Sequence, residues 1–251
     1  EDVIDQIRGI LLRFGVIFFR DQELSVEEQK RIARRFGEIF VHPFFVAGDD
    51  PEIIIIHRKP EDTSIVGFEW HTDTSSALMP PMGSILYAIK VPKIGGDTMF
   101  ANQYLAYDRL SEGMKQMLGS LNAVHSDRRV AGPNSGRNTG RATKAHDSVD
   151  WKETINIHPV IRTHPETGRK CLYVNHSYTV GFENMTEAES KPLLDWLMDW
   201  GHRPEFTCRF RWEEGSIAFW DNRCTKHLAL GDAVDSERIM RRVQLSGDRP
   251  V

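Results

Sequence analysis

The chain has 251 residues, of which 40% are hydrophobic, and a formal net charge of −4. This length and apolar content suit one large domain, and nothing marks a linker, so we expect a single domain over residues 1–251. The small negative charge gives no electrostatic reason to bind nucleic acid or an anionic membrane, and no apolar run approaches the length of a transmembrane helix.

The start of the chain and its cysteines bear on processing and location. Glu1 is not an initiator methionine and falls directly into a helical pattern, so we expect that an N-terminal segment is missing. No signal peptide is visible. Cys171, Cys208 and Cys224 are odd in number and lack the spacing of a metal site, so we interpret them as free thiols in a reducing cytoplasm. The oligomeric state is left open, a homo-oligomer included.

In the first half of the chain, the hydrophobic pattern alternates between helical and strand periods. Ser25, with Glu28 three residues later, forms a capping box, and Ser111 caps a later helix. In chain order, we predict a helix over residues 1–14, a strand at Val16–Phe19, a helix from Ser25 to about Phe36, strands at Ile53–His57, Gly83–Lys90 and Met99–Phe100, and helices at Asn102–Leu110 and Glu112–Leu118.

The second half opens on residues 126–150, which are polar and contain several Arg and Lys residues. We interpret them as a mobile loop, either a lid over a site or a merely disordered excursion. The many short strands and few helices of the chain indicate an α+β fold, a double-stranded β-helix (jelly roll) core with surrounding helices. After the loop we predict strands at Ile155–Thr163 and Cys171–Asn175, a helix from the capping box at Thr186 to Gly201, and strands at Phe206–Trp212, Ile217–Trp220 and Arg238–Leu245.

The stretch Trp70–Thr74 offers an imidazole and a carboxylate two positions apart. If it is a β-strand, alternate side chains share a face, so His71 and Asp73 point the same way and Thr72 points away. Two such ligands and one distant histidine form the facial 2-His-1-carboxylate set, which holds Fe(II) and leaves open positions for other ligands.

Two other segments carry the same weak motif, so the motif alone does not identify a metal site. In His164-Pro165-Glu166, the proline fits a turn better than a regular strand. His125-Ser126-Asp127 runs into Arg128-Arg129, which we interpret as a salt-bridged segment beside a loop. For any one of these pairs, the ordinary alternative is a surface pair or a pair that only supports a site.

Several motifs occur in a fixed order along nearly the whole chain. They are Trp70–Asp73, Gly95–Thr98, Trp220–Arg223 followed by His227, Arg238–Met240 followed by Arg242, and a closing Gly-Asp-x-Pro at residues 247–250. This ordered set resembles the taurine dioxygenase family, whose relatives include alkylsulfatase and phenoxyalkanoate dioxygenases. The resemblance implies that His71, Asp73 and His227 are the iron ligands, and it sets His125 and Asp127 aside.

The resemblance also implies the reaction: a mononuclear non-haem Fe(II) enzyme that uses 2-oxoglutarate and O2 and releases succinate and CO2. Arg238 lies 11 positions after His227 (238 − 227), where the family places the arginine that pairs with the distal carboxylate of 2-oxoglutarate. Thr98 matches the hydroxyl partner. The ordinary alternative for Arg238 is a solvated strand face, and for Trp220, which matches an aromatic residue near the iron, it is core packing.

The substrate pocket follows from the same resemblance. His42 matches a histidine that contacts the sulfonate in taurine dioxygenase, and Arg242, which on a strand shares a face with Arg238 near the co-substrate, matches its arginine partner. Both imply a small anionic head group. Phe45 and Gly67 replace a tyrosine and an asparagine near the taurine amine, and Tyr178 matches a phenylalanine. The loss of polar partners weakens selection for taurine itself and favours a more apolar tail.

We therefore predict a Fe(II)- and 2-oxoglutarate-dependent dioxygenase that hydroxylates a small organic anion: a sulfonate such as taurine, an alkyl sulfate or an aryloxyalkanoate. One alternative is a biosynthetic hydroxylase of a larger amino-acid-type substrate, which a wide, neutral pocket in place of His42 and Arg242 would favour. The other is a non-catalytic jelly-roll protein that binds a metal, which would need no co-substrate site such as Arg238 and Thr98.

Overall fold

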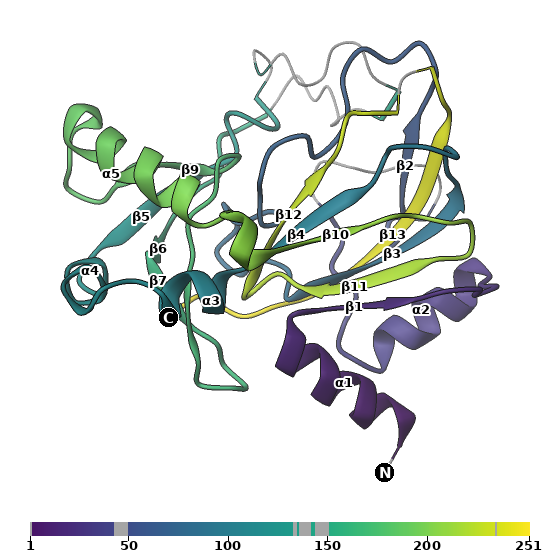
Figure 1. Ribbon diagram of the computed structural model, residues 1–251, viewed down its shortest axis with the longest axis horizontal. Helices are drawn as coiled ribbons and strands as arrows, with labels where there is room; N and C mark the ends of the chain where they lie inside the picture. Colours follow the sequence, from purple (N-terminus) through teal and green to yellow (C-terminus); the bar gives the residue numbers. More distant parts are fainter. Residues whose placement is uncertain (1, 43–49, 133–134, 136–141, 144–150, 234) are drawn as a thin grey trace.

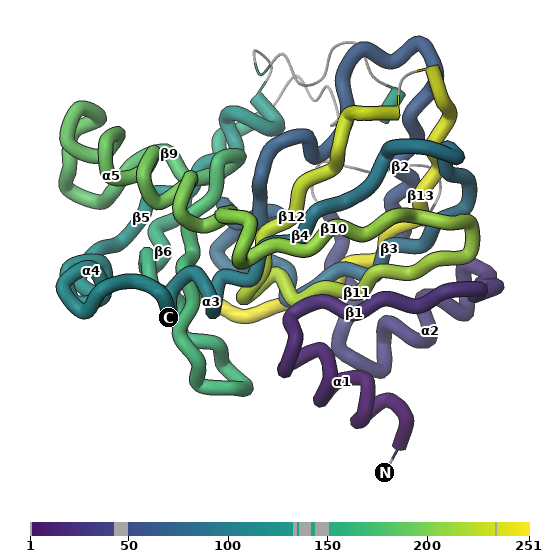
Figure 2. Tube along the Cα trace, in the orientation of Figure 1, coloured from purple at the N-terminus to yellow at the C-terminus, as the bar shows by residue number. Residues whose placement is uncertain are grey.

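Two antiparallel sheets form the centre of the protein, whose structure is a computed structural model that describes residues 2–42, 50–132, 135, 142–143, 151–233 and 235–251 (Figure 1). The larger sheet has the strand order β1 (Val16–Phe19), β11 (Ile217–Asp221), β3 (Gly83–Lys90), β13 (Arg238–Leu245) and β2 (Ile54–Arg58). The smaller sheet has the order β10 (Thr207–Phe210), β4 (Thr98–Asn102) and β12 (Thr225–Ala229). Segments far apart in the sequence are neighbours here, as β1 and β11 show in Figure 2.

The remaining elements lie around these two sheets. A third sheet has the order β6 (Ile155–Pro159), β5 (Asn122–Ser126) and β9 (Thr179–Phe182), and β7 (Ile161–Thr163) pairs with β8 (Lys170–Leu172). The helices are α1 (Val3–Phe14), α2 (Val26–Arg34), α3 (Gln103–Asp108), α4 (Glu112–Leu118), α5 (Glu187–Trp200) and a 3-10 turn at Pro204–Phe206. None of the helices in the described part of the chain has the length and apolar character that crossing a membrane demands.

Apolar side chains from both central sheets pack together. Leu86 and Met240 of the larger sheet meet Phe100 and Phe210 of the smaller one in one buried cluster. On its other face the larger sheet buries Val243 against α1 and α2, which lie beneath it in Figure 1. Burial between two sheets is what gives a jelly roll its core, so the predicted α+β jelly roll with outer helices is confirmed.

The predictions that depend on local signals agree with the structure. Both capping boxes form, with Ser25 and Glu28 at the start of α2 and Thr186 and Glu189 at the start of α5. Strands β3 and β13 have the predicted bounds. A capping box satisfies two helix N–H groups within four residues, so its formation needs no distant partner.

Four other sequence interpretations need correction. Trp70–Thr74 is not a strand, because only His71 forms a bridge, with His227, before the chain turns through Thr74 at a φ of +49°. Three strands, β5, β9 and β12, were not predicted at all. Each owes its strand state to partners elsewhere in the chain rather than to its own apolar pattern.

The predicted loop at residues 126–150 lies mostly outside the described residues. Ser126 ends β5, and Thr143 contacts β2, where its Oγ1 atom accepts a hydrogen bond from the His57 backbone N–H (2.8 Å). Thr143 therefore lies against the edge strand of the larger sheet.

Candidate active site

The two segments that carry the predicted metal ligands meet at a β-bridge between His71 and His227. The His71 N–H donates to the His227 carbonyl (3.0 Å), and the His227 N–H donates to the His71 carbonyl (2.8 Å). Thr72 points away from this point, as predicted, and its hydroxyl donates to the Thr225 carbonyl. Although Trp70–Thr74 is not a strand, the bridge and the following turn still bring His71, Asp73 and His227 together.

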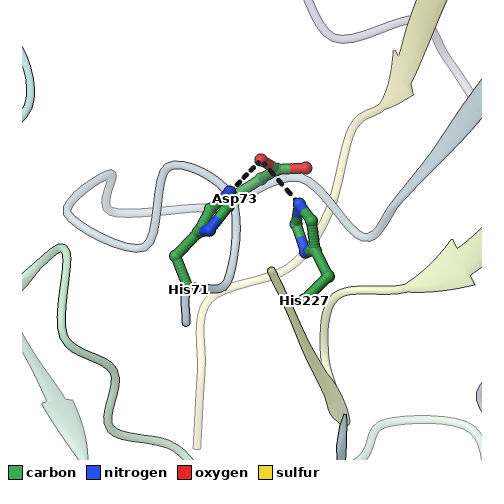
Figure 3. Close-up of side chains that lie close together, drawn as sticks. All are labelled: His71, Asp73 and His227. Carbon is green, nitrogen blue, oxygen red and sulfur yellow. Dashed lines mark ion pairs between the residues drawn. The ribbon is translucent and has the colours of Figure 1, made fainter. Parts of the chain in front are cut away.

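Figure 3 shows both imidazoles pointing at one carboxylate oxygen of Asp73. The Nε2 atoms of His71 and His227 lie 3.6 and 3.7 Å from Asp73 Oδ1. These distances are too long for hydrogen bonds. Two ligands on one ion are roughly 3 to 3.5 Å apart when each metal bond is about 2.1 Å. The three donors therefore leave a gap of the size that a metal ion fills, and their chemistry suits Fe(II).

Electrostatics keep these side chains in the state in which they bind metal. Burial alone would raise the pKa of Asp73, but Arg242 and the two imidazoles outweigh it and hold that pKa well below its usual range. Burial, with His71 beside it, holds the pKa of His227 well below its usual range. The histidine is therefore neutral and the aspartate ionised, so both present lone pairs to an ion.

Neighbouring groups orient two of the three ligands. His71 Nδ1 donates to the Glu69 carbonyl (2.7 Å), which leaves Nε2 without a proton. The Ser84 hydroxyl donates to Asp73 Oδ2 (3.0 Å), and Arg242 Nη1 donates to Asp73 Oδ1 (3.1 Å). Sequence reasoning missed Ser84, because its position opposite Trp220 and Gln244 depends on sheet pairing.

In a second group of potential ligands, His164, Asp221 and Cys224, hydrogen bonds already occupy the imidazole and the carboxylate. His164 Nδ1 accepts two backbone N–H groups, so Nε2 carries the proton and donates it to Asp221 (3.0 Å). Arg223 donates to both carboxylate oxygens of Asp221. Burial raises the pKa of Cys224 well above its usual value, so the thiol stays neutral. This cluster is a buried ion-pair network, and His164–Gly168 is a turn, as predicted.

The other competing motif also lies away from the metal centre, and within the described ranges it forms no salt bridge. His125 is completely buried on β5, and its Nδ1 atom lies 3.0 Å from the Ser75 hydroxyl. Asp127 is buried too and accepts the Thr154 N–H, while Arg129 donates to two backbone carbonyls. The sequence interpretation of this segment was wrong, because a polar strand buried between β6 and β9 has the pattern of a surface segment.

A cavity opens beside His71 and Asp73, and three of the four predicted substrate residues line it. His42 and Tyr178 are 3% and 6% exposed, and Arg242 is 6% exposed. Phe45 lies outside the described residues. The further lining residues are Val66, Gly67, Phe68, Val130 and Ser177.

Two features of this cavity concern the charge of His42 and the space beside Gly67. Burial, helped by the charge of Arg242, lowers the pKa of His42 to about 3, so this imidazole is neutral, with Nε2 3.1 Å from the Thr74 hydroxyl. Gly67 has a φ of +80°, and a Cβ there would lie 3.1 Å from His71 Cε1. A larger residue at position 67 would therefore press on a predicted metal ligand.

Arg238 lines a second cavity, which shares Val66 with the first. Its Nε atom is buried and has no hydrogen-bond partner among the described residues. Thr98 lies across from Ala229, which lines the same cavity. The Trp212 indole N–H donates to the Thr98 hydroxyl (2.9 Å), and the Arg238 guanidinium lies 5.7 Å from the centre of the Trp212 ring. Trp212, which sequence reasoning did not select, thus contacts both predicted co-substrate residues.

Trp220 packs in the core and also lies beside a predicted metal ligand. Its ring is 1% exposed in the core between the sheets, and its centre lies 4.7 Å from that of His227. Arg241 points to the other face of β13, as predicted, and donates to Gln29 and to the Leu24 carbonyl.

Comparisons with known proteins agree with one another. The family model described as "Taurine catabolism dioxygenase TauD, TfdA family" matches residues 1–244. An alkylsulfatase of Acinetobacter baylyi is 36% identical to this chain, and the aligned region spans 99% of this chain and 78% of the alkylsulfatase. An alpha-ketoglutarate-dependent sulfate ester dioxygenase of Pseudomonas putida is 34% identical, and the aligned region spans 99% of this chain and 82% of that enzyme. The crystal structure of a taurine dioxygenase from Burkholderia xenovorans has a TM-score of 0.82 and 39% identity, covering 99% and 81%.

Proposed function

This chain belongs to the taurine catabolism dioxygenase TauD, TfdA family, and from that premise we propose which anion it oxidises and which residues do the work. It is a non-haem iron dioxygenase that uses Fe(II), 2-oxoglutarate and O2 and hydroxylates a small organic anion. The observation that carries the proposal is the convergence of His71, Asp73 and His227 beside a cavity that contains Arg242. The non-catalytic alternative loses its support, because the relatives are enzymes.

In the proposed site, His71 Nε2, His227 Nε2 and Asp73 Oδ1 would hold the iron. When bound, Fe(II) with 2-oxoglutarate and O2 supplies the oxidant for C–H hydroxylation and yields succinate and CO2. The protein's own part is to orient the ligands. Glu69 fixes the His71 tautomer, and Ser84 with Arg242 fixes the Asp73 carboxylate.

Arg238 and Thr98 are the proposed partners of the distal carboxylate of 2-oxoglutarate. His227 and Ala229 share a face of β12, two residues or about 7 Å apart. The carboxyl carbons of 2-oxoglutarate are about 5 Å apart across four C–C bonds of roughly 1.5 Å. Since Ala229 pairs with Thr98 and lines the Arg238 cavity, a co-substrate bound at the metal end reaches this cavity.

Trp212→Phe tests how Thr98 is oriented. The variant keeps an aromatic ring beside Arg238 but removes the N–H that the Thr98 hydroxyl accepts. Loss of one neutral hydrogen bond is worth about 0.5–1.5 kcal/mol, so we expect the Kd of 2-oxoglutarate to rise roughly 2- to 12-fold. Calorimetric titration of the anaerobic Fe(II) enzyme measures this. An unchanged Kd would remove Trp212 from the co-substrate site.

Arg242 and His42 are the proposed partners of the substrate's anionic group. Arg242 uses one nitrogen for Asp73, while its buried Nε has no partner among the described residues. Beside them, Val66, Phe68 and Tyr178 provide an apolar wall for a tail. We propose a sulfate ester, alkyl sulfonate or aryloxyalkanoate, hydroxylated at the carbon next to the heteroatom, after which the product breaks at that bond. The alternative, a biosynthetic hydroxylase of a larger amino-acid-type substrate, called for a wide, neutral pocket, and a cavity that contains Arg242 disfavours it.

Substrates with an apolar tail should therefore outperform taurine in kcat/KM. Each extra buried methylene contributes about 0.8 kcal/mol, or about fourfold. A panel of taurine, alkyl sulfonates, alkyl sulfates and aryloxyalkanoates, scored by succinate formation, checks the order. A clear preference for taurine over all the others would refute the proposed tail pocket and leave the metal and co-substrate assignments in place.

We further propose that residues 1–251 act as one catalytic domain in a reducing cytoplasm. All three cysteines are free thiols, and burial raises the pKa of Cys171 to about 12, so its thiol is chemically inert.

A further inference from the structure

A second arginine lies beside Arg238 at the end of the larger sheet. Strands β2 and β13 pair antiparallel, with Arg58 directly opposite Arg238. Directly opposed residues of such a pair project from the same face of the sheet, and like charges there destabilise the pairing. An anion bound between two arginines at this position would relieve that repulsion.

Both arginines line the same cavity. The Nε atoms of Arg58 and Arg238 are buried, and neither has a hydrogen-bond partner in the described ranges. Burial, with the charge of Arg58 beside it, lowers the pKa of Arg238 to about 10, which still leaves it protonated at neutral pH. A buried, unpaired N–H of a charged group is costly, so the cavity is complete only with a bound acceptor.

Nearby carboxylates are engaged elsewhere. Glu237 accepts from His57 (2.9 Å) and Lys90 (2.7 Å). Asp97 accepts from Arg209 (2.6 Å). Asp62, which lines the cavity, accepts the backbone N–H groups of Lys59 and Ala142 through one oxygen. Among the ion pairs of the described residues, none involves Arg58 or Arg238, so no described carboxylate is paired with either guanidinium group.

Arg58 lies at the mouth of this cavity. It also lines a wider groove, which shares Ser64, Ile65, Ala229 and Leu230 with the arginine cavity. Arg58 and Arg238 are both partly exposed as whole residues, while the Nε atom of each is buried. An anion that enters from the groove passes Arg58 before it reaches Arg238.

We propose that Arg58 is a second guanidinium for the distal carboxylate of 2-oxoglutarate, held between Arg58 and Arg238. This inference rests on the proposed function. It makes Arg58 a specificity residue, because two guanidinium groups favour a 2-oxo acid with a second carboxylate over one that ends in a methyl group. Thr98 donates a third hydrogen bond to the same carboxylate, since its oxygen already accepts from Trp212.

The test compares two ligands on matched variants. Arg58→Gln keeps the approximate length and removes the charge, and Lys59→Gln removes one charge from the adjacent exposed position. The ligands are 2-oxoglutarate and 2-oxovalerate, which has the same carbon count but no distal carboxylate. Binding to the Fe(II)-loaded enzyme without O2 is measured by calorimetry, so the readout does not depend on turnover.

For Arg58→Gln, we expect the Kd of 2-oxoglutarate to rise about tenfold and that of 2-oxovalerate to stay unchanged. Lys59→Gln should leave both unchanged, and Arg58→Lys should lie between the wild type and Arg58→Gln. A folding defect would weaken the binding of both ligands equally, so an equal rise in both Kd values counts against the proposal. Unchanged 2-oxoglutarate binding in Arg58→Gln, with weakened binding in Arg238→Gln, overturns the role of Arg58 and leaves the proposed function intact. A wild-type protein that does not bind 2-oxoglutarate overturns both.

Discussion

Replacing His71, Asp73 or His227 by alanine is expected to abolish turnover, because each change removes one of only three proposed protein ligands. Iron content after anaerobic loading and desalting should fall to background in each variant, and succinate formation should stop. Asp73→Ala also leaves the buried Arg242 without its carboxylate, which costs about 3–5 kcal/mol of stability. Thermal unfolding of each variant separates this effect from loss of metal.

His125→Ala is the matched control, because this histidine belongs to the competing motif. It should keep its iron, although it should unfold at a lower temperature, since His125 is buried and contacts Ser75. Loss of iron from His125→Ala, together with retention in His71→Ala, would show that the wrong motif was assigned.

Arg238→Gln is expected to raise the Kd of 2-oxoglutarate roughly 10- to 150-fold, since a charge-assisted hydrogen bond is worth about 1.5–3 kcal/mol. Arg238 is enclosed, its Nε has no partner among the described residues, and its cavity adjoins that of the metal ligands. Succinate formation at increasing 2-oxoglutarate concentrations should show a higher KM for this co-substrate.

Arg241→Gln is the control for this prediction. Arg241 is on the same strand but points to the opposite face, where it contacts Leu24 and Gln29. It should lower stability and leave the 2-oxoglutarate requirement unchanged. The reverse pattern, with Arg241→Gln affecting the co-substrate and Arg238→Gln silent, would contradict the assigned face of β13.

The parts of the fold that sequence reasoning could predict are those specified locally. The capping boxes at Ser25 and Thr186 need only their own four residues, and both form. The apolar pattern and length of Gly83–Lys90 identify a strand whatever its neighbours are. The ordered motifs allowed His71, Asp73 and His227 to be grouped despite 154 positions (227 − 73) between the last two.

The remainder depends on pairing between distant segments. Strand β12 contains Lys226, which is 1% exposed, and β5 contains the buried His125, so neither has the apolar alternation of a typical strand. Ser84 and Arg58 were not predicted as site residues. Ser84 contacts Asp73 and Arg58 lies opposite Arg238, and both contacts depend on the fold. A residue's neighbour on the next strand is invisible until the register is known.

The most direct test of the metal and co-substrate assignments is an anaerobic titration of the Fe(II)-loaded protein with 2-oxoglutarate, followed by the visible charge-transfer band of the chelate. The proposed site predicts a saturable band for the wild type, a band that needs much more 2-oxoglutarate in Arg238→Gln, and none in His71→Ala, Asp73→Ala or His227→Ala. A wild type without the band, or ligand variants that keep it undiminished, would contradict the assignment of this site.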